Sequence, residues 1–81
     1  MSEPDRRAVI EAWFAGRGIT LRYSVVGDPA RDQEWVAVML PGRPDTGVAE
    51  GGGGVTKLAA AEDAVARYLK DHPDESPPSF D

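Results

Sequence analysis

Four consecutive glycines, Gly51–Gly54, constrain this 81-residue chain more than any other feature. Glycine has no side chain to restrict its backbone, and the run predicts a bend that leads into a helix. Thr56, two residues further on, is a good N-cap for that helix, and Lys57 follows it. A helix start offers free backbone N–H groups and the positive end of a dipole, so the junction is a candidate phosphate seat. The same residues also fit a plain turning connector.

Other ligand-binding motifs are missing from the sequence. The glycine run lacks the Gly-Lys-Ser/Thr order of a nucleotide-binding P-loop, and it lacks the third glycine and following acid of a dinucleotide fingerprint. The chain has no cysteine and one histidine, His72, which offers neither a metal-ligand cluster nor a nucleophile–histidine set. We therefore expect a protein that is not an enzyme and that holds no cofactor or metal.

The net charge of −5 is spread unevenly along the chain. Residues 1–70 hold ten acids and nine bases, whereas residues 71–81 hold four acids and no base. The folded part is therefore nearly neutral and lacks the broad basic footprint of a strong nucleic-acid binder. No apolar run approaches the ~18 residues that a membrane span requires, and nothing resembles a signal peptide. We expect a cytoplasmic protein with no membrane contact, and the abundance of Ala, Arg, Gly and Pro suggests a bacterial source.

The first element predicted is an amphipathic helix that Ser2 caps and that ends at Gly16 and Gly18. Its apolar side chains recur at helical spacing and form one stripe: Val9, Ile10, Trp13 and Phe14. Two strands, residues 19–26 and 35–40, follow with a turn over 27–32 between them, and a weaker third strand covers 46–50. A second helix begins after Thr56 and stops before Pro73. We expect the aromatic rings of Trp13, Phe14 and Trp35 to anchor the core.

This order, α-β-β-β-α, predicts an α+β domain over residues 1–72. Three antiparallel strands form one sheet, and two helices cover its apolar face in a two-layer sandwich. The polar side chains of the first strand, Thr20, Arg22 and Ser24, should meet solvent. Residues 73–81, which we call the tail, are acidic and rich in proline, and we expect them to be flexible. An alternative interpretation makes Phe80 part of a short docking motif for a partner.

The chain resembles the double-stranded RNA-binding domain family over about residues 4–70. The family's junction before its last helix reads G-x-G-x-S-K-K-x-A-K, and residues 52–61 lie on that pattern without a gap. Tyr23 is similar to the family's first-strand tyrosine, and Glu11 precedes it by the spacing usual for the first-helix glutamate. Residues 27–29 resemble its hairpin loop, and Trp35 stands where an aromatic residue opens the second strand.

The resemblance implies weak, shape-based binding of duplex RNA. Lys57 and Thr56 would touch phosphate, Arg7 and Glu11 would face a minor groove, and Arg31 would lie at the hairpin loop. Only Lys57 remains of the family's three basic residues, and the loop lacks its histidine. The alternative is therefore a protein–protein interaction module that keeps the fold and has lost the RNA surface, with its partner on the helix pair or on a sheet edge. Arg7 and Glu11 also fit a solvated helix face with an i,i+4 ion pair.

Overall fold

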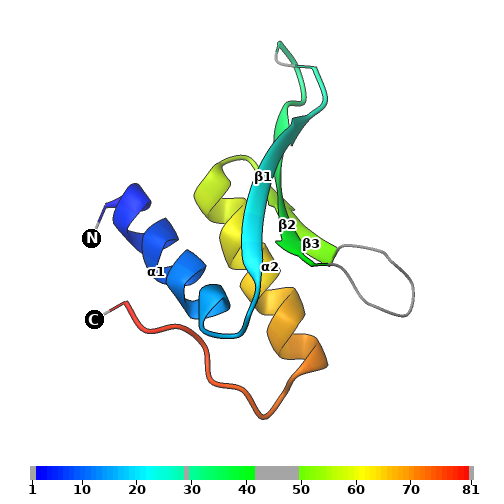
Figure 1. Cartoon of the computed structure of the whole chain (residues 1–81). Helices are drawn as coiled ribbons and strands as arrows, with labels where there is room; N and C mark the ends of the chain where they lie inside the picture. Colours follow the sequence, from blue (N-terminus) through cyan, green and yellow to red (C-terminus); the bar gives the residue numbers. More distant parts are fainter. Residues whose placement is uncertain (1, 29, 42–49, 81) are drawn as a thin grey trace.

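The computed structural model describes residues 2–28, 30–41 and 50–80 of the chain (Figure 1). Its elements are, in chain order, α1 (Glu3–Ala15), β1 (Thr20–Val26), β2 (Glu34–Leu40), β3 (Glu50–Gly54) and α2 (Lys57–Asp71). The strands form one antiparallel sheet in the order β1-β2-β3. This confirms the α-β-β-β-α fold class predicted from the sequence. All five elements lie within the predicted domain of residues 1–72.

Both helices begin at the caps that the sequence predicts. Oγ of Ser2 accepts from the backbone N–H of Asp5 at 3.4 Å, and Oγ1 of Thr56 accepts from Ala59 at 3.0 Å. Each cap satisfies an N–H group that has no partner within the first turn of its helix. The second helix stops at Asp71, two residues ahead of Pro73, as expected.

The two long strands present one side to the helices and the other to solvent. Thr20, Arg22 and Ser24 are exposed, as predicted for the outer side of β1. On the inner side, Tyr23 pairs in register with Ala37, and Ala37 pairs with Gly52 of β3. This row of side chains becomes smaller from β1 to β3, which allows a helix to lie closest to the sheet over its β3 edge.

The prediction that the glycine run forms a bend is wrong, because Gly51–Gly54 lie in β3. The reason is that α2 packs unusually close to this strand. A Cβ atom added to Gly52 would lie 2.3 Å from the backbone nitrogen of Ala64, and one added to Gly54 would lie 2.5 Å from Cβ of Ala59. Only glycine allows that approach. The weaker strand predicted over residues 46–50 overlaps with β3 only at Glu50. Residues 46–49 lie outside the described residues.

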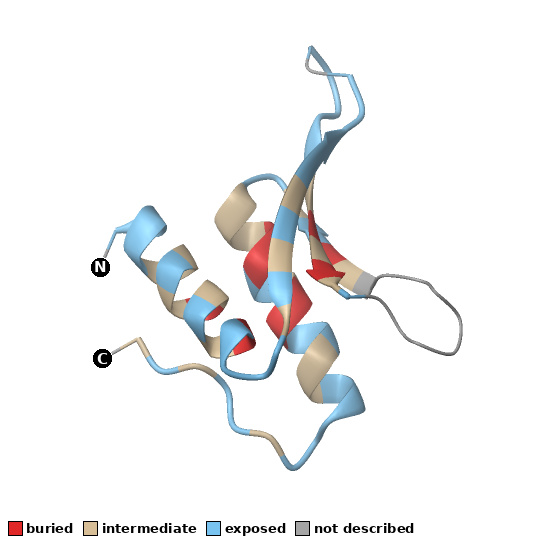
Figure 2. Cartoon of the chain, in the orientation of Figure 1, coloured by how far each residue is buried: buried red, intermediate tan, exposed pale blue. Residues whose placement is uncertain are grey.

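A small apolar core lies between the helices and the sheet (Figure 2). The buried apolar residues among those described come from α1, β2 and α2: Ile10, Phe14, Ala37, Met39, Ala60, Ala61, Ala64 and Val65. Half of them are alanines, so α1 supplies the two largest fully buried side chains, Phe14 and Ile10. Of the three predicted aromatic anchors, Phe14 is fully buried, whereas Trp13 and Trp35 are half-buried and pack against the core.

Candidate nucleic-acid interface

The candidate interface is centred on Tyr23, where α1, β1 and the start of α2 meet. The Tyr23 hydroxyl donates to Oε2 of Glu11 across 2.6 Å, and Nε of Arg7 lies 3.6 Å from the same oxygen. The Arg7 guanidinium lies 5.6 Å from the centre of the Tyr23 ring. Nζ of Lys57 lies 5.9 Å from that centre and 4.9 Å from the ring centre of Trp35. We call these five residues, Arg7, Glu11, Tyr23, Trp35 and Lys57, the Tyr23 cluster.

Four separate elements bring the cluster together: α1, β1, β2, which contributes Trp35, and α2. Arg7 and Glu11 are one turn apart on α1 and therefore share a side of that helix. Tyr23 belongs to the alternate residues of β1 that face the helices. Lys57 is the first residue of α2, so its position depends on how closely α2 packs on β3. The structure thus joins three of the five predicted site residues, Arg7, Glu11 and Lys57, around one ring.

The surroundings of Tyr23 determine its protonation. Burial is the largest cause that raises the pKa of its hydroxyl, and the hydrogen bond to the Glu11 carboxylate and that group's negative charge raise the pKa further. The hydroxyl is therefore a donor at all physiological pH values. Since Tyr23 and Arg7 both contact Glu11, its carboxylate has a defined position next to the Arg7 guanidinium.

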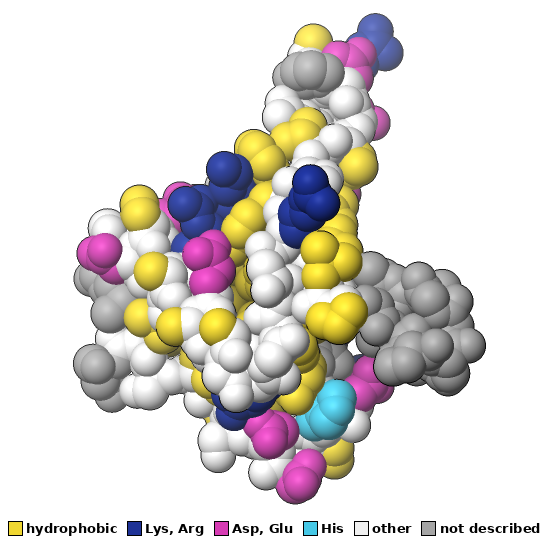
Figure 3. All heavy atoms as spheres, in the orientation of Figure 1, with side chains coloured by type: hydrophobic (Ala, Val, Ile, Leu, Met, Phe, Trp, Pro, Cys, Tyr) yellow, Lys and Arg dark blue, Asp and Glu magenta, His cyan; other side chains and the backbone are white. Residues whose placement is uncertain are grey.

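Basic side chains gather on the face shown in Figure 3, where α1 lies beside β1. The Tyr23 cluster contributes two cations and one carboxylate, so it is locally positive in a chain whose net charge is −5. The Lys57 ammonium lies near the faces of two aromatic rings, which attract a cation electrostatically. A phosphate that approached this surface would meet positive charge from both helices.

The start of α2 offers fewer donors than the glycine run suggests. Thr56 uses its hydroxyl oxygen to cap the helix. The glycines are part of β3, which pairs with β2, and the backbone N–H of Gly53 donates to Oδ2 of Asp63 at 3.0 Å. A phosphate seat built on glycine amides is therefore excluded for Gly53. Lys57 and the end of the helix dipole remain as the features of this junction that favour an anion.

The fifth predicted residue, Arg31, lies in the hairpin between β1 and β2. This hairpin projects away from both helices in Figure 1. Its turn is held by two hydrogen bonds from the backbone N–H groups of Arg31 and Asp32 to the carbonyl oxygen of Asp28. Arg31 is exposed and does not join the Tyr23 cluster. The predicted loop residue Pro29 lies outside the described residues.

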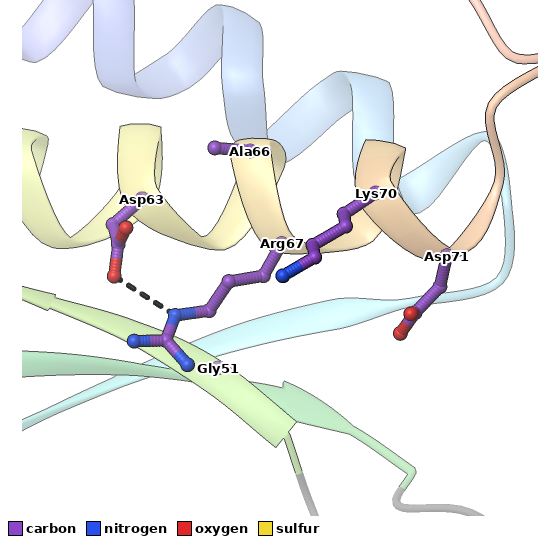
Figure 4. Close-up of a pocket in the computed structure, with 6 residues that line it drawn as sticks. All are labelled: Gly51, Asp63, Ala66, Arg67, Lys70 and Asp71. Atoms are coloured by element: carbon purple, nitrogen blue, oxygen red, sulfur yellow. Dashed lines mark hydrogen bonds and ion pairs between the residues drawn. The ribbon is translucent and has the colours of Figure 1, made fainter.

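A second charged surface, shown in Figure 4, lies between α2 and the free edge of β3. It is a hollow of about 580 Å³ lined by Gly51, Asp63, Ala66, Arg67, Lys70 and Asp71. Nε of Arg67 lies 3.0 Å from Oδ2 of Asp63, and Lys70 extends into the same hollow. The hydrogen bond from Gly53 is the main cause that lowers the pKa of Asp63, and Arg67 lowers it further. Since its two cations face two carboxylates, this hollow does not select for an anion.

Sequence reasoning missed two features of these surfaces. Trp35 was expected only in the core, yet its ring also lies beneath the Lys57 ammonium. The sequence did not single out Asp63, which accepts a hydrogen bond from the backbone of β3. A helical stripe of alanines opposite a run of glycines was the available signal, because small residues on both sides predict a close helix–strand contact.

No family model, curated protein or solved structure matches this chain. Among the described residues, no three histidine, cysteine or carboxylate side chains lie close enough together to bind a metal ion. Neither of the helices in the described part of the chain has the length and apolar character needed to cross a membrane.

Proposed function

We propose that this chain is a non-catalytic binding module of the double-stranded RNA-binding type, with weak affinity for duplex RNA. The observation that carries the proposal is the Tyr23 cluster, in which Lys57 of α2 and Arg7 of α1 lie 5.9 and 5.6 Å from the centre of one ring. Such domains read duplex shape through sugar hydroxyls and phosphates, and they contact successive grooves from separate elements. The projecting hairpin with Arg31 supplies the separate element here.

The affinity is expected to be low because few cations are available. Each Lys or Arg that neutralises a phosphate releases counterions, and this release dominates affinity for a nucleic-acid backbone. Lys57 is the only basic residue in the first turn of α2, and Arg7 already pairs with Glu11. We therefore expect micromolar binding that weakens steeply as salt is added.

The test is a titration of an RNA duplex of ~16 base pairs, the length such a domain spans. Wild-type protein, Lys57→Ala and Lys70→Ala would be compared at about 50 and 150 mM salt by fluorescence anisotropy. Lys70→Ala is a matched control, because it removes the same charge from the other end of α2. Lys57→Ala should weaken binding by on the order of tenfold at the lower salt and reduce the salt dependence by about one counterion.

Two results would contradict the proposal. The first is no binding of wild-type protein at the lower salt concentration. The second is an equal loss for Lys57→Ala and Lys70→Ala, because net charge alone would then explain the affinity. A DNA duplex of the same sequence should bind more weakly than the RNA, since it lacks the 2′-hydroxyl groups and the A-form shape.

The second candidate is a protein-interaction module that keeps the fold. One specific observation favours it: the described part of the tail already lies along the helix pair as an extended peptide. This face therefore offers a hydrogen-bond donor and apolar contacts to a peptide ligand.

A further inference from the structure

The tail returns along the helices after α2 ends, and Figure 1 shows it running beside α1. Two contacts hold its first part there. The indole N–H of Trp13 donates to the carbonyl oxygen of Ser76 at 3.2 Å. Nε of Arg17 lies 2.6 Å from Oε2 of Glu75. The flexibility predicted for this segment stays a prediction, but its described residues have defined partners.

Phe80 lies at the far end of this path, over the seam between α1 and α2. The Arg6 guanidinium covers its ring, with 4.4 Å between Cζ and the ring centre. Arg6 is itself oriented by Glu62 of α2, with 3.6 Å between the two charged groups. The aromatic ring thus contacts an arginine that belongs to α1 and forms an ion pair with α2.

The surface beneath is apolar. A hollow of about 180 Å³ is lined by Ile10, Glu62 and Val65 of the helices and by Pro77, Pro78 and Phe80 of the tail. Ile10 is fully buried and Val65 is 8% exposed, so the two side chains form the floor of this site. We call the helix side of the site, Arg6, Ile10, Trp13, Glu62 and Val65, the helix-pair groove.

The bound segment, residues 75–80, has the chemistry of a short recognition motif. Pro77 and Pro78 lack N–H donors and have restricted backbones, so the segment loses little entropy when it binds and presents carbonyl oxygens as acceptors. An indole N–H that donates to a carbonyl beside a proline pair is a feature of proline-rich peptide recognition by aromatic grooves. Glu75 and Phe80 add a charged contact and an aromatic anchor at either end.

We propose that the helix-pair groove is a binding site for proline-rich segments of a partner protein, and that the tail is its resident ligand. The partner segment has an acidic residue, two adjacent prolines and an aromatic residue in the order and spacing of residues 75–80. It displaces the tail and takes over the same contacts. This inference rests on the second candidate function and names its partner, and it is independent of RNA binding because its test contains no nucleic acid.

The contacts of the tail are suited to displacement. In the described structure they amount to one hydrogen bond, one ion pair, one cation–ring contact and the apolar contacts of Pro77, Pro78 and Phe80. A tethered segment competes with a free peptide at an effective concentration of about millimolar. A free peptide must therefore overcome this competition in the wild-type chain, and weakening the tail should reveal the affinity of the groove.

The experiment titrates a fluorescein-labelled peptide with the sequence of residues 74–80 into the full-length chain. Phe80→Ala removes the aromatic anchor of the tail and leaves the helix-pair groove unchanged. We expect the peptide to bind Phe80→Ala at least about tenfold more tightly than wild type, because the resident competitor is weakened. A scrambled peptide without adjacent prolines should bind neither protein. Glu75→Gln, which removes only the ion pair with Arg17, should give a smaller gain and serves as the milder second variant.

Matched tryptophan variants test the proposed geometry. In the Phe80→Ala background, Trp13→Phe keeps an aromatic ring but loses the indole donor, and it should weaken peptide binding several-fold. Trp35→Phe makes the same change away from the groove and should leave binding unaffected. The Trp13 indole N–H resonance should shift in Phe80→Ala and return toward its wild-type position when the peptide is added.

Three outcomes would overturn the proposal. The first is peptide binding by Phe80→Ala and Glu75→Gln that is no tighter than by wild type. The second is equal peptide affinity for the Trp13→Phe and Trp35→Phe variants. The third is a concentration-dependent mass of a dimer in light scattering that Phe80→Ala abolishes, which would make the groove a site for the tail of a second copy.

Discussion

The carboxylate of Asp63 accepts two hydrogen bonds. Its Oδ2 accepts from the backbone N–H of Gly53 and from Nε of Arg67, each at 3.0 Å. β3 is an edge strand, and Gly53 has no side chain with which to protect its own amide. The Asp63 side chain therefore supplies the hydrogen-bond acceptor for the Gly53 N–H, because no further strand in the described part of the chain pairs with β3 at this edge.

Replacing Asp63 separates these contributions. We expect Asp63→Ala to lower the free energy of unfolding by about 1 kcal/mol at neutral pH, and Asp63→Asn to lower it by less, because an amide oxygen still accepts from Gly53. The Asp63 pKa is lowered in the folded state, so its contribution is complete above the unfolded value of about 3.9 and disappears as pH falls through the folded pKa. Urea unfolding at about pH 7 and about pH 2.5 checks this. A difference between Asp63→Ala and wild type that is independent of pH would contradict it.

Sequence reasoning at this scale succeeded where a single element fixes the geometry. The i,i+4 spacing of Arg7 and Glu11 and the alternation that turns Tyr23 inward are local properties, and the structure confirms both. The ring of Trp35 beneath Lys57 depends on the seating of α2 over the sheet. No local pattern encodes that contact.

The contact between β3 and α2 is the feature that distinguishes this domain at the scale of its elements. Two of the four glycines in β3, Gly52 and Gly54, would place a Cβ atom within 2.5 Å of an atom of α2, and the helix opposite them has Ala60 and Ala64 fully buried. Backbone meets backbone along this contact. The alanines of α2 and the glycines of β3 thus together allow the helix to pack closely on the strand.

Adjacent glycines provide a matched test of that contact. Gly52→Ala would place its Cβ 2.3 Å from the nitrogen of Ala64, and we expect it to cost at least about 2 kcal/mol because α2 must shift. Gly53→Ala has its nearest neighbour at 3.7 Å and should change the free energy of unfolding by less than about 1 kcal/mol. Urea denaturation of both variants measures the difference. Similar losses for the two variants would show that the close contact does not govern stability.

Most elements could be predicted from the sequence, and the exception has a physical explanation. Caps, proline stops and alternation fix α1, β1, β2 and α2 to within a residue or two, because these signals act through neighbouring residues. β3 gives no such signal. Glycine has a low intrinsic preference for strands. Gly51–Gly54 form a strand through non-local contacts, which are the pairing with β2 and, at Gly52 and Gly54, the close approach of α2.

The whole molecule depends on a small core. A single core in a chain of this size supplies roughly 3–5 kcal/mol of net stability. Phe14 is fully buried and makes edge-to-face contacts with Trp13 and Tyr68, at ring-centre distances of 4.9 and 5.7 Å. Much of the apolar stabilisation thus depends on one side chain of α1.

Removing that side chain should unfold most of the protein. Phe14→Ala is expected to cost about 3–5 kcal/mol, which is comparable to the total stability. Val55→Ala serves as the control, because Val55 is 77% exposed and its truncation should change the stability by less than about 0.5 kcal/mol. Thermal unfolding followed by circular dichroism distinguishes the two. A cooperative transition for Phe14→Ala at the wild-type temperature would contradict this view of the core.

The seating of the second helix on bare backbone also governs the electrostatics at its first turn. Gly54 lies against that turn at Ala59, which is only two residues beyond Lys57. A methyl group on residue 54 would therefore push the start of α2 away from the strand. The ammonium would then rise away from the two rings below it. The lack of a side chain at Gly54 thereby keeps the Lys57 ammonium close to the Tyr23 and Trp35 rings.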